Sequence, residues 1–230
     1  MKKGTPLITF GYSTAIKHRF PELASQAILF DGVTTEADVS GPVREFTRIA
    51  NVRLATGSES EFPEIQAWRR TFAKMGLKPT QYRCAAEALL RRLRKEQSLP
   101  AIHPLVDICN AISVAFATPI ALFDTARVHT HLEVRQAEGT EVYQTFSGET
   151  ETPEAGEVIF ADHAGHAHAR RWSNRQSGRS IIRPQTASVL IVAEALHDGA
   201  AEDLMRLKAA LEHALPDAWP LGRIIKFPTG

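Results

Sequence analysis

The chain has 230 residues, of which 43% are hydrophobic and 23% are charged, and its formal net charge at pH 7 is +1. This composition is typical of one large globular domain or two closely packed lobes, and it excludes collagen-like, disulfide-rich and disordered classes. The longest apolar run, which begins at Ala111, contains a proline and is too short to cross a membrane, so we expect no membrane partner. The basic N-terminus lacks a signal-peptide core, and two cysteines, Cys84 and Cys109, are typical of a reducing compartment. We therefore expect a cytoplasmic protein.

Charge is unevenly distributed along the chain. Nine Lys or Arg residues and one acid lie at 69–95, seven glutamates and one base at 133–157, and five arginines and one acid at 158–183. Nineteen of the 27 basic residues are arginine, which makes planar, bidentate contacts to carboxylate or phosphate. Solvated surfaces explain any one run, but two basic segments on either side of an acidic one indicate function more strongly than either alone.

Apolar spacing and turn residues predict an ordered series of helices and strands. The first five expected elements are two strands and three helices, at 6–12, 26–33, 43–54, 62–75 and 80–97. Gly76 is expected to end the second helix, and Thr80 to cap the third. Prolines in 98–107 interrupt this pattern, so we expect a lobe boundary near residue 100 within a single domain of 1–230.

After residue 100 the pattern changes from helices to strands. A short buried helix is expected from Asp107, its predicted N-cap, to Pro119. Five strands and a final helix follow, at 120–124, 130–137, 141–146, 156–162, 188–196 and 200–219. A helix-rich part, 1–100, followed by a sheet-rich part, 101–230, predicts an α+β fold with a mixed or largely antiparallel sheet flanked by helices.

Three histidines and an aspartate in 161–168 form the first candidate site. Asp162, His163, His166 and His168 could supply metal ligands, but their spacing matches no strong signature such as H-E-x-x-H. We interpret “HAGHAH”, centred on Gly165, as a hairpin turn, and we expect no metal and no other cofactor. A metal-dependent hydrolase built on these histidines is the least favoured alternative.

Motifs for other common chemistries do not occur in the chain. It contains no G-x-S-x-G, no G-x-x-x-x-G-K-[ST] and no G-x-G-x-x-G, which argues against serine hydrolases, nucleoside triphosphatases and dinucleotide enzymes. Cys109 lies in an apolar helical segment, where a thiol usually behaves as a small hydrophobic group.

Polar residues in apolar surroundings are the remaining candidates. Asn110 and Ser113 lie on an otherwise hydrophobic helix, and they either bond a neighbouring backbone or line a polar pocket. The segment “RRWSNRQS” combines arginines with Trp172 and Gln176, and so offers stacking, anion binding and amide recognition. Its alternative role is a structural Arg–Glu network with the acidic strands at 133–157.

Four ordered segments carry a family resemblance. They are “WRRTFAKMGLKPTQYRCAAEALLRRL”, “LPAIHPLVDICNAISVAFATPIALFD”, “PEAGEVIFAD” and “RRWSNRQS”. In this order, over about residues 61–196, they resemble the stand-alone proteins of the B3/4 family, which is similar to the editing domain of the phenylalanyl-tRNA synthetase beta subunit. The resemblance implies an α+β fold with a central sheet and a pocket between its two parts.

The resemblance also implies a function. In the synthetase, the similar domain hydrolyses tyrosine wrongly esterified to tRNA, without a bound metal. For this chain it implies a trans-editing hydrolase that removes a misattached amino acid from tRNA. A non-catalytic module that binds tRNA or an amino acid is the alternative. The expected partner is therefore tRNA or the 3′ end of an aminoacyl-tRNA, or a free amino acid, and not DNA.

The matching motifs assign site residues by resemblance. Those implied for catalysis are Asn110, Ser113, Arg175 and Gln176. Those implied for the pocket and substrate are His103, Asp124, Glu133, Arg170 and Trp172. Those expected to position the tRNA backbone are Arg69, Arg70, Arg91, Arg92 and Arg94. Two positions depart from the family pattern, because His103 stands where an asparagine is expected and Asn174 where an aromatic residue is common.

Overall fold

The computed structural model describes residues 8–225. Its α-helices are α1 (Thr14–Arg19), α2 (Ser40–Thr56), α3 (Pro63–Lys74), α4 (Ala85–Glu96), α5 (Pro104–Phe116) and α6 (Ala200–Ala218), and its short 3-10 helices are η1 (Glu59–Glu61) and η2 (Thr125–Arg127). Its strands are β1 (Thr9–Tyr12), β2 (Ala24–Asp31), β3 (Ile120–Asp124), β4 (His131–Gln136), β5 (Val142–Gln144), β6 (Thr150–Glu151), β7 (Val158–Asp162), β8 (His166–Arg170), β9 (Arg175–Gln176), β10 (Ser188–Ala195) and β11 (Arg223–Ile225).

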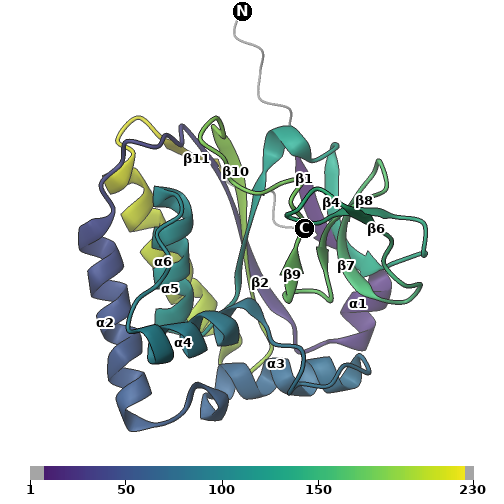
Figure 1. Ribbon diagram of the computed structural model, residues 1–230, viewed down its shortest axis with the longest axis horizontal. Coiled ribbons are helices and arrows are strands. Elements are labelled where there is room, and N and C mark those ends of the chain that lie inside the picture. The colour runs from purple at the N-terminus through teal and green to yellow at the C-terminus, as the bar shows by residue number, and fades with distance from the viewer. Residues whose placement is uncertain (1–7, 226–230) are drawn as a thin grey trace, which may run out of the picture.

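The elements form three layers (Figure 1). Helices α2, α5 and α6 cover one face of a four-stranded sheet, whose order is β11-β2-β10-β3, and a seven-stranded sheet lies on the opposite face. The seven-stranded sheet has the order β1-β4-β7-β8-β5-β6, with β9 also paired to β8. Its β1–β4 and β5–β8 pairs are parallel and its other pairs are antiparallel. The predicted α+β fold with a mixed sheet flanked by helices is confirmed.

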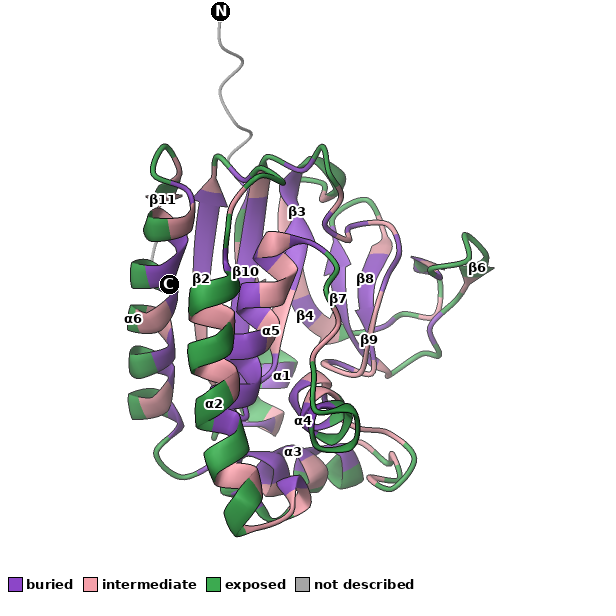
Figure 2. Ribbon diagram, turned by 60° about the vertical axis from the view of Figure 1, so that its left-hand side comes forward, coloured by how far each residue is buried: buried purple, intermediate pink, exposed green. Residues whose placement is uncertain are grey.

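The middle sheet is buried on both faces. On β10, Leu190 and Val192 pack in the cluster shared with the seven-stranded sheet, whereas Val189 and Ile191 pack in the cluster shared with α5 and α6. Burial on both faces explains why this strand is a continuous apolar run without alternation. Figure 2 shows the buried strands in the centre and the exposed outer faces of α2 and α6. Among the described residues no helix is long and apolar enough to span a membrane.

Elements from before residue 100 contribute to both sheets. Strand β1 pairs with β4 in the seven-stranded sheet, and β2 pairs with β10 in the four-stranded sheet. The predicted strand at 6–12 begins outside the described residues, and β1 covers its later part. The short elements α1, β6, β8, β9 and β11 were not expected, because two to six residues carry too little periodicity to be recognised.

Helix ends follow local rules where tertiary contacts do not override them. Gly76 has a φ of +81° directly after the end of α3, as predicted. The prediction of Thr80 as the cap of α4 is wrong, because 78–82 form a turn and the helix begins at Ala85. The backbone N–H of Ala85 donates to the carbonyl of Ser173 at 2.9 Å, and the Asn174 side chain donates to the carbonyl of Arg83 at 2.8 Å. Contacts with a distant hairpin therefore set this helix start.

The cap of α5 also differs from the prediction. His103, rather than Asp107, is its N-cap, and the Nδ1 of His103 accepts from the backbone N–H of Leu105 at 3.1 Å. The carboxylate of Asp107 instead accepts from the backbone N–H groups of Ile102 and His103, at 2.8 and 3.3 Å. Both side chains thus satisfy donors at the start of the helix.

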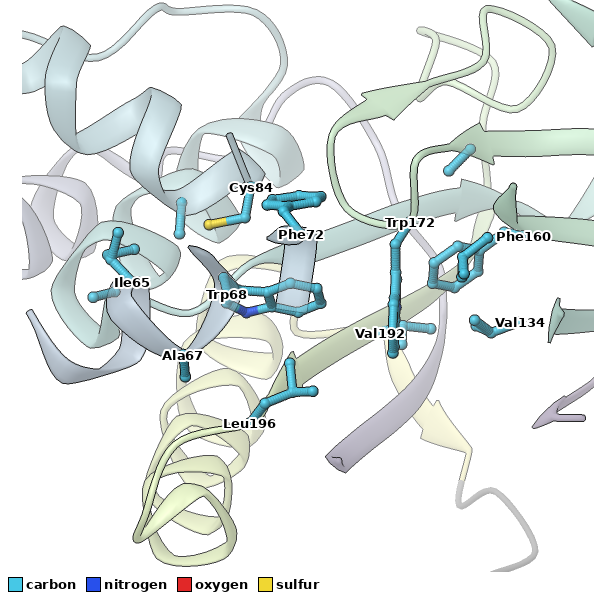
Figure 3. Packing of buried hydrophobic residues seen from close by; sticks show 14 of the residues in the cluster. Ile65, Ala67, Trp68, Phe72, Cys84, Val134, Phe160, Trp172, Val192 and Leu196 are labelled. Atoms are coloured by element: carbon cyan, nitrogen blue, oxygen red, sulfur yellow. The ribbon is translucent and has the colours of Figure 1, made fainter. Parts of the chain in front are cut away.

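A buried aromatic group joins the helices at the base of the molecule to the seven-stranded sheet. The rings of Trp68 and Trp172 meet edge to face with centroids 5.3 Å apart, and Phe20 meets Trp172 in the same way at 5.0 Å. Figure 3 shows Trp172 between Trp68 on one side and Phe160 on the other. Such aromatic pairs stabilise a core by about 0.5–1.5 kcal/mol beyond their burial.

One carboxyl group connects the two sheets. The Oε1 of Glu194, on β10, accepts hydrogen bonds from the Tyr12 hydroxyl on β1 and from the Trp172 indole Nε1, each at 2.8 Å. Glu194 is 2% exposed, and burial raises its pKa to about 7, although the two hydrogen bonds act in the opposite direction. The same burial, together with the charge of Glu194, raises the pKa of Tyr12.

We predict that the free energy of unfolding contains a pH-dependent contribution from Glu194. The folded state keeps this proton up to about pH 7, whereas the unfolded chain releases it near the ordinary value of 4.5. Stability therefore falls as pH rises between these values, by on the order of 3 kcal/mol, and the loss is complete above them. Urea denaturation of wild type and Glu194→Gln at pH 5 and pH 8 should show the variant gaining stability relative to wild type at pH 8.

A Glu212→Gln control on the exposed face of α6 should show no such gain. An identical difference between wild type and Glu194→Gln at both pH values would contradict the prediction.

Candidate functional site

The turn between β8 and β9 has an unusual backbone. Arg171 and Trp172 both have left-handed conformations, with φ values of +47° and +56°, although neither is glycine. For L-residues this conformation costs about 1–2 kcal/mol each. Tertiary contacts stabilise it: the N–H of Trp172 donates to the carbonyl of Val158 at 2.7 Å, and the N–H of Arg171 donates to Glu157 at 2.9 Å. The buried Trp172 ring fixes the turn from the other side.

Two of the predicted site arginines lie in an Arg–Glu network. Arg170 binds both oxygens of Glu157, at 2.9 and 2.7 Å, and donates to Glu151 at 2.7 Å. Arg175 binds Glu151 through both terminal nitrogens, at 2.9 and 3.1 Å. Both guanidinium groups also lie over the Tyr143 ring. Burial raises the pKa of Glu157, but the hydrogen bonds and charge of Arg170 outweigh it, and the pKa is lowered. The acidic and basic sequence runs therefore meet within one sheet.

The neighbouring residues of the same motif have structural contacts. Gln176 donates its side-chain amide to the carbonyl of Leu122 on β3, and its own carbonyl accepts from the Tyr143 hydroxyl at 2.7 Å. It thus connects the seven-stranded sheet to the edge of the four-stranded sheet. Trp172 is fully buried in the core and bonds Glu194, so it does not stack on a surface ligand in this structure.

The residues predicted from α5 lie in another layer. Ser113 is buried, and its hydroxyl donates to the carbonyl of Thr118 at 2.7 Å, which closes the end of the helix. Asn110 is half-buried, and its amide makes no hydrogen bond with the described part of the chain. No contact between described residues joins Asn110 or Ser113 to Arg175, so the four predicted catalytic residues do not form one hydrogen-bonded group.

The other predicted pocket residues are dispersed. His103 caps α5, burial lowers its pKa, and its Nε2 is buried without a partner among the described residues. Asp124 accepts from the N–H of Ala126 at 3.0 Å and from the Thr186 hydroxyl at 2.8 Å, and so closes the end of β3. Glu133 is half-buried in β4, between β1 and β7.

The arginines predicted to contact tRNA lie on α3 and α4. Arg69 pairs with the buried Glu87 at 2.5 Å, and Arg91 and Arg94 both approach the buried Glu59, at 3.7 and 3.1 Å. Arg92 pairs with the exposed Glu96 at 2.8 Å. Arg70 is exposed and has no ion pair with another described residue. Because Glu59 serves two arginines, that group keeps an excess positive charge.

Asp162 and His168 of the histidine segment form a buried hydrogen-bonded chain with Ser180, rather than a cluster of free metal ligands. The Nε2 of His168 lies 3.1 Å from the Asp162 carboxylate, and its Nδ1 lies 2.9 Å from the Ser180 hydroxyl. Asp162 also accepts from the N–H groups of His129 and His166, each at 3.0 Å. Within residues 8–225, no group of three or more His, Cys, Asp or Glu is arranged to bind a metal ion. Because Asp162, His168 and Ser180 are all buried, a substrate does not reach the Ser180 hydroxyl.

Within residues 8–225, an apolar groove and a polar pocket lie outside these contacts. The groove, of about 840 Å³, lies between α2 and the segment 98–107. The pocket, of about 400 Å³, lies beside the left-handed turn, and Arg171 and Tyr82 line it. None of the predicted catalytic residues lines either cavity. The sequence did not indicate Glu194 or Ser180, because nothing in the local pattern distinguishes a buried carboxyl or a buried, hydrogen-bonded hydroxyl.

Comparisons with known proteins agree with this architecture. A protein-family model described as the B3/4 domain matches residues 67–209, more than half of the chain. A crystal structure of an N-terminal fragment of the phenylalanyl-tRNA synthetase beta subunit from Pyrococcus horikoshii is similar to 94% of this chain, with a TM-score of 0.53 and 12% identity. At that identity the likeness shows the fold, and the chain covers 50% of the fragment. None of the curated proteins compared with the chain matches it.

We predict that the two network arginines differ in their contribution to stability. Arg170→Ala leaves the buried Glu157 without its arginine partner, and we expect it to lower the free energy of unfolding by about 3–5 kcal/mol. Arg175→Ala removes a side chain that is 39% exposed and pairs with Glu151, which is 34% exposed. We expect it to lower the free energy of unfolding by less than about 1 kcal/mol. Urea denaturation at pH 7 measures both. Equal losses for the two variants would show that burial does not set their importance.

Proposed function

Because the chain belongs to the B3/4 domain family, we propose that it is a tRNA-associated trans-editing hydrolase, which removes a misattached amino acid from aminoacyl-tRNA. The observation that carries this proposal is the family match over residues 67–209. That range includes α5, which carries Asn110 and Ser113, and the RRWSNRQS hairpin, within a fold shared with a phenylalanyl-tRNA synthetase fragment.

The proposed chemistry requires few catalytic groups. An aminoacyl ester is already activated, so its hydrolysis depends on a positioned water and on donors to the carbonyl more than on a strong base. Asn110 is the residue that holds the water or the aminoacyl group, because its amide makes no hydrogen bond with other residues in 8–225 and remains available. Arg175 suits the carbonyl or the terminal ribose, because its partly exposed guanidinium can exchange Glu151 for substrate. The vicinal hydroxyl of the terminal adenosine assists proton transfer, and no metal takes part.

The remaining two residues position these groups. Ser113 fixes the end of α5 through the Thr118 carbonyl, and Gln176 fixes β9 to β3 through the Leu122 carbonyl. Each contact lies within a few residues of one of the proposed catalytic side chains. Loss of either is therefore expected to displace Asn110 or Arg175 and to lower the rate indirectly.

Exposed arginines on α3 and α4 support the proposed tRNA contact. Arg70 has no described acidic partner, and Arg92 pairs only with a surface glutamate, so both can bind phosphate at little cost. Arg91 and Arg94 share one buried carboxylate and leave a net positive charge beside them. Contacts of this kind position a nucleic-acid backbone without reading its sequence.

We expect the purified protein to hydrolyse at least one ester in a panel of misacylated tRNAs faster than buffer does. Asn110→Ala and Arg175→Ala should each lower that rate by about a hundredfold, because each removes a group that orients the ester or its water. Release of the labelled amino acid measures the rate, and Arg206→Ala on α6 is the control. If no ester is cleaved faster than in buffer, the chain is not a hydrolase for this panel. Retained tRNA affinity would then favour the non-catalytic binding module.

Binding of uncharged tRNA tests the proposed surface separately. The double variant Arg70→Gln, Arg92→Gln spares the buried Glu59 and Glu87 and so leaves the fold intact. It should weaken binding and reduce the slope of log affinity against log salt by about 1–2, since each lost phosphate contact contributes about 0.9. Fluorescence anisotropy from 50 to 200 mM salt measures this slope, with Arg206→Gln, Arg223→Gln as a charge-matched control. An equal effect of the control pair would mean that net charge, rather than this surface, binds the RNA.

A further inference from the structure

The polar pocket of about 400 Å³ lies where four separate segments meet. They are the end of α1, the connection from α3 to α4, the segment before β7, and the left-handed turn after β8. The connection and the turn are tied together by the backbone hydrogen bond between Ala85 and Ser173. The walls of the pocket are therefore fixed by the fold.

One wall is cationic. The guanidinium of Arg171 lies over the Tyr82 ring, 4.8 Å from its centroid, and donates no hydrogen bond within residues 8–225. Arg19 donates one hydrogen bond to the carbonyl of Lys74 at 2.8 Å and keeps its other N–H groups. A guanidinium that stacks on an aromatic ring and has unused N–H groups is oriented to bind both oxygens of a carboxylate.

The pocket also contains one available negative charge. Glu157 lines it, but its carboxylate is occupied by Arg170 and by the N–H of Arg171. Glu154 lines the same pocket, is exposed, and forms no ion pair with any residue that the structure describes. A free carboxylate disfavours a phosphate group here, because like charges repel. A free cation and a free anion at one pocket instead favour a ligand that carries both charges.

Hydrophobic residues form one part of the remaining lining. They are Met75, Leu77, Tyr82 and Val158, of which Val158 is buried in the core. The volume falls within the range of about 300–1,000 Å³ that is usual for small-molecule sites. A ligand that carries an apolar or aromatic group beside its two charges therefore fits this lining.

The backbone of Arg171 supports a role in binding. A left-handed arginine is strained, and such strain concentrates at functional sites, where the surrounding structure stabilises it. Here the conformation separates two adjacent arginines, since Arg170 lies in the buried network and Arg171 lines the pocket. A turn built from asparagine or glycine would adopt the same shape with less strain and without the guanidinium.

We propose that this pocket binds a free α-amino acid with an apolar or aromatic side chain. Arg171 binds the carboxylate, Glu154 binds the ammonium group, and the side chain packs against Tyr82, Met75 and Leu77. An aminoacyl ester has no free carboxylate, so this site recognises the free amino acid and not the ester. The inference therefore goes beyond the proposed hydrolysis and does not rest on it.

Isothermal titration calorimetry without RNA tests the proposal. The probes are L-phenylalanine, L-tyrosine and L-leucine, with phenylalaninamide and 3-phenylpropanoate as analogues that lack the carboxylate or the ammonium group. At least one amino acid should bind with a Kd below about 1 mM, and each analogue should bind at least about tenfold more weakly. No detectable binding of any of the three amino acids, or binding of inorganic phosphate alone, would overturn the proposal.

Two variants assign the binding to this pocket. Arg171→Asn keeps a residue that tolerates the left-handed turn and removes the guanidinium, and Glu154→Gln removes the exposed carboxylate. Each should weaken amino-acid binding by at least about tenfold, with an unchanged or higher midpoint of thermal unfolding. Arg206→Gln is the control and should bind as wild type does. Unchanged binding in both Arg171→Asn and Glu154→Gln would place the ligand elsewhere and refute the assignment. Because these titrations contain no tRNA, a failure of the editing proposal leaves their outcome unaffected.

Discussion

The carboxyl group of Glu194 is the point on which the rest of the architecture depends. It lies on β10, one of the two inner strands of the four-stranded sheet, and accepts from Tyr12 in the other sheet and from Trp172 in the turn after β8. Removing a carboxyl from water is costly, and a raised pKa is the expected response to that burial. The group therefore joins two sheets and a turn through a protonated or strongly hydrogen-bonded carboxyl rather than through an exposed ion pair.

Fixing Trp172 has consequences for the residues beside it. Its ring lies in the core and its backbone N–H donates to Val158, and both Trp172 and the preceding Arg171 have left-handed conformations. Arg170 and Arg171 then lie in different surroundings, one in the buried network with Glu157 and one at a pocket over Tyr82. Three consecutive residues thus have different roles. Trp172 packs in the core, Arg170 is buried and paired with Glu157, and the charge of Arg171 remains available at the pocket.

The basic helices show the same distinction between paired and available charge. Glu59 and Glu87 are buried and neutralise much of the arginine charge that the sequence concentrates in this region. The charge left for a partner is carried by the more exposed residues, such as Arg70 and Arg92. A run of basic residues therefore overstates the positive surface, because acids that precede α3, such as Glu59, or lie within α4, such as Glu87, pair with it.

Periodicity and turn chemistry were enough to predict the α+β class, the long helices and most strands. Those features arise from local spacing, as in the apolar steps of α3 and the glycine that ends it. The resemblance to the B3/4 family also followed from ordered motifs and is supported by the family match. The start of α4 and the cap of α5 could not be predicted, because a contact with a distant hairpin and a histidine side chain set them. The same is true of the roles of Glu194 and Arg171. Their partners lie 182 and about 89 positions away along the chain, and only packing brings such groups within hydrogen-bond or stacking distance.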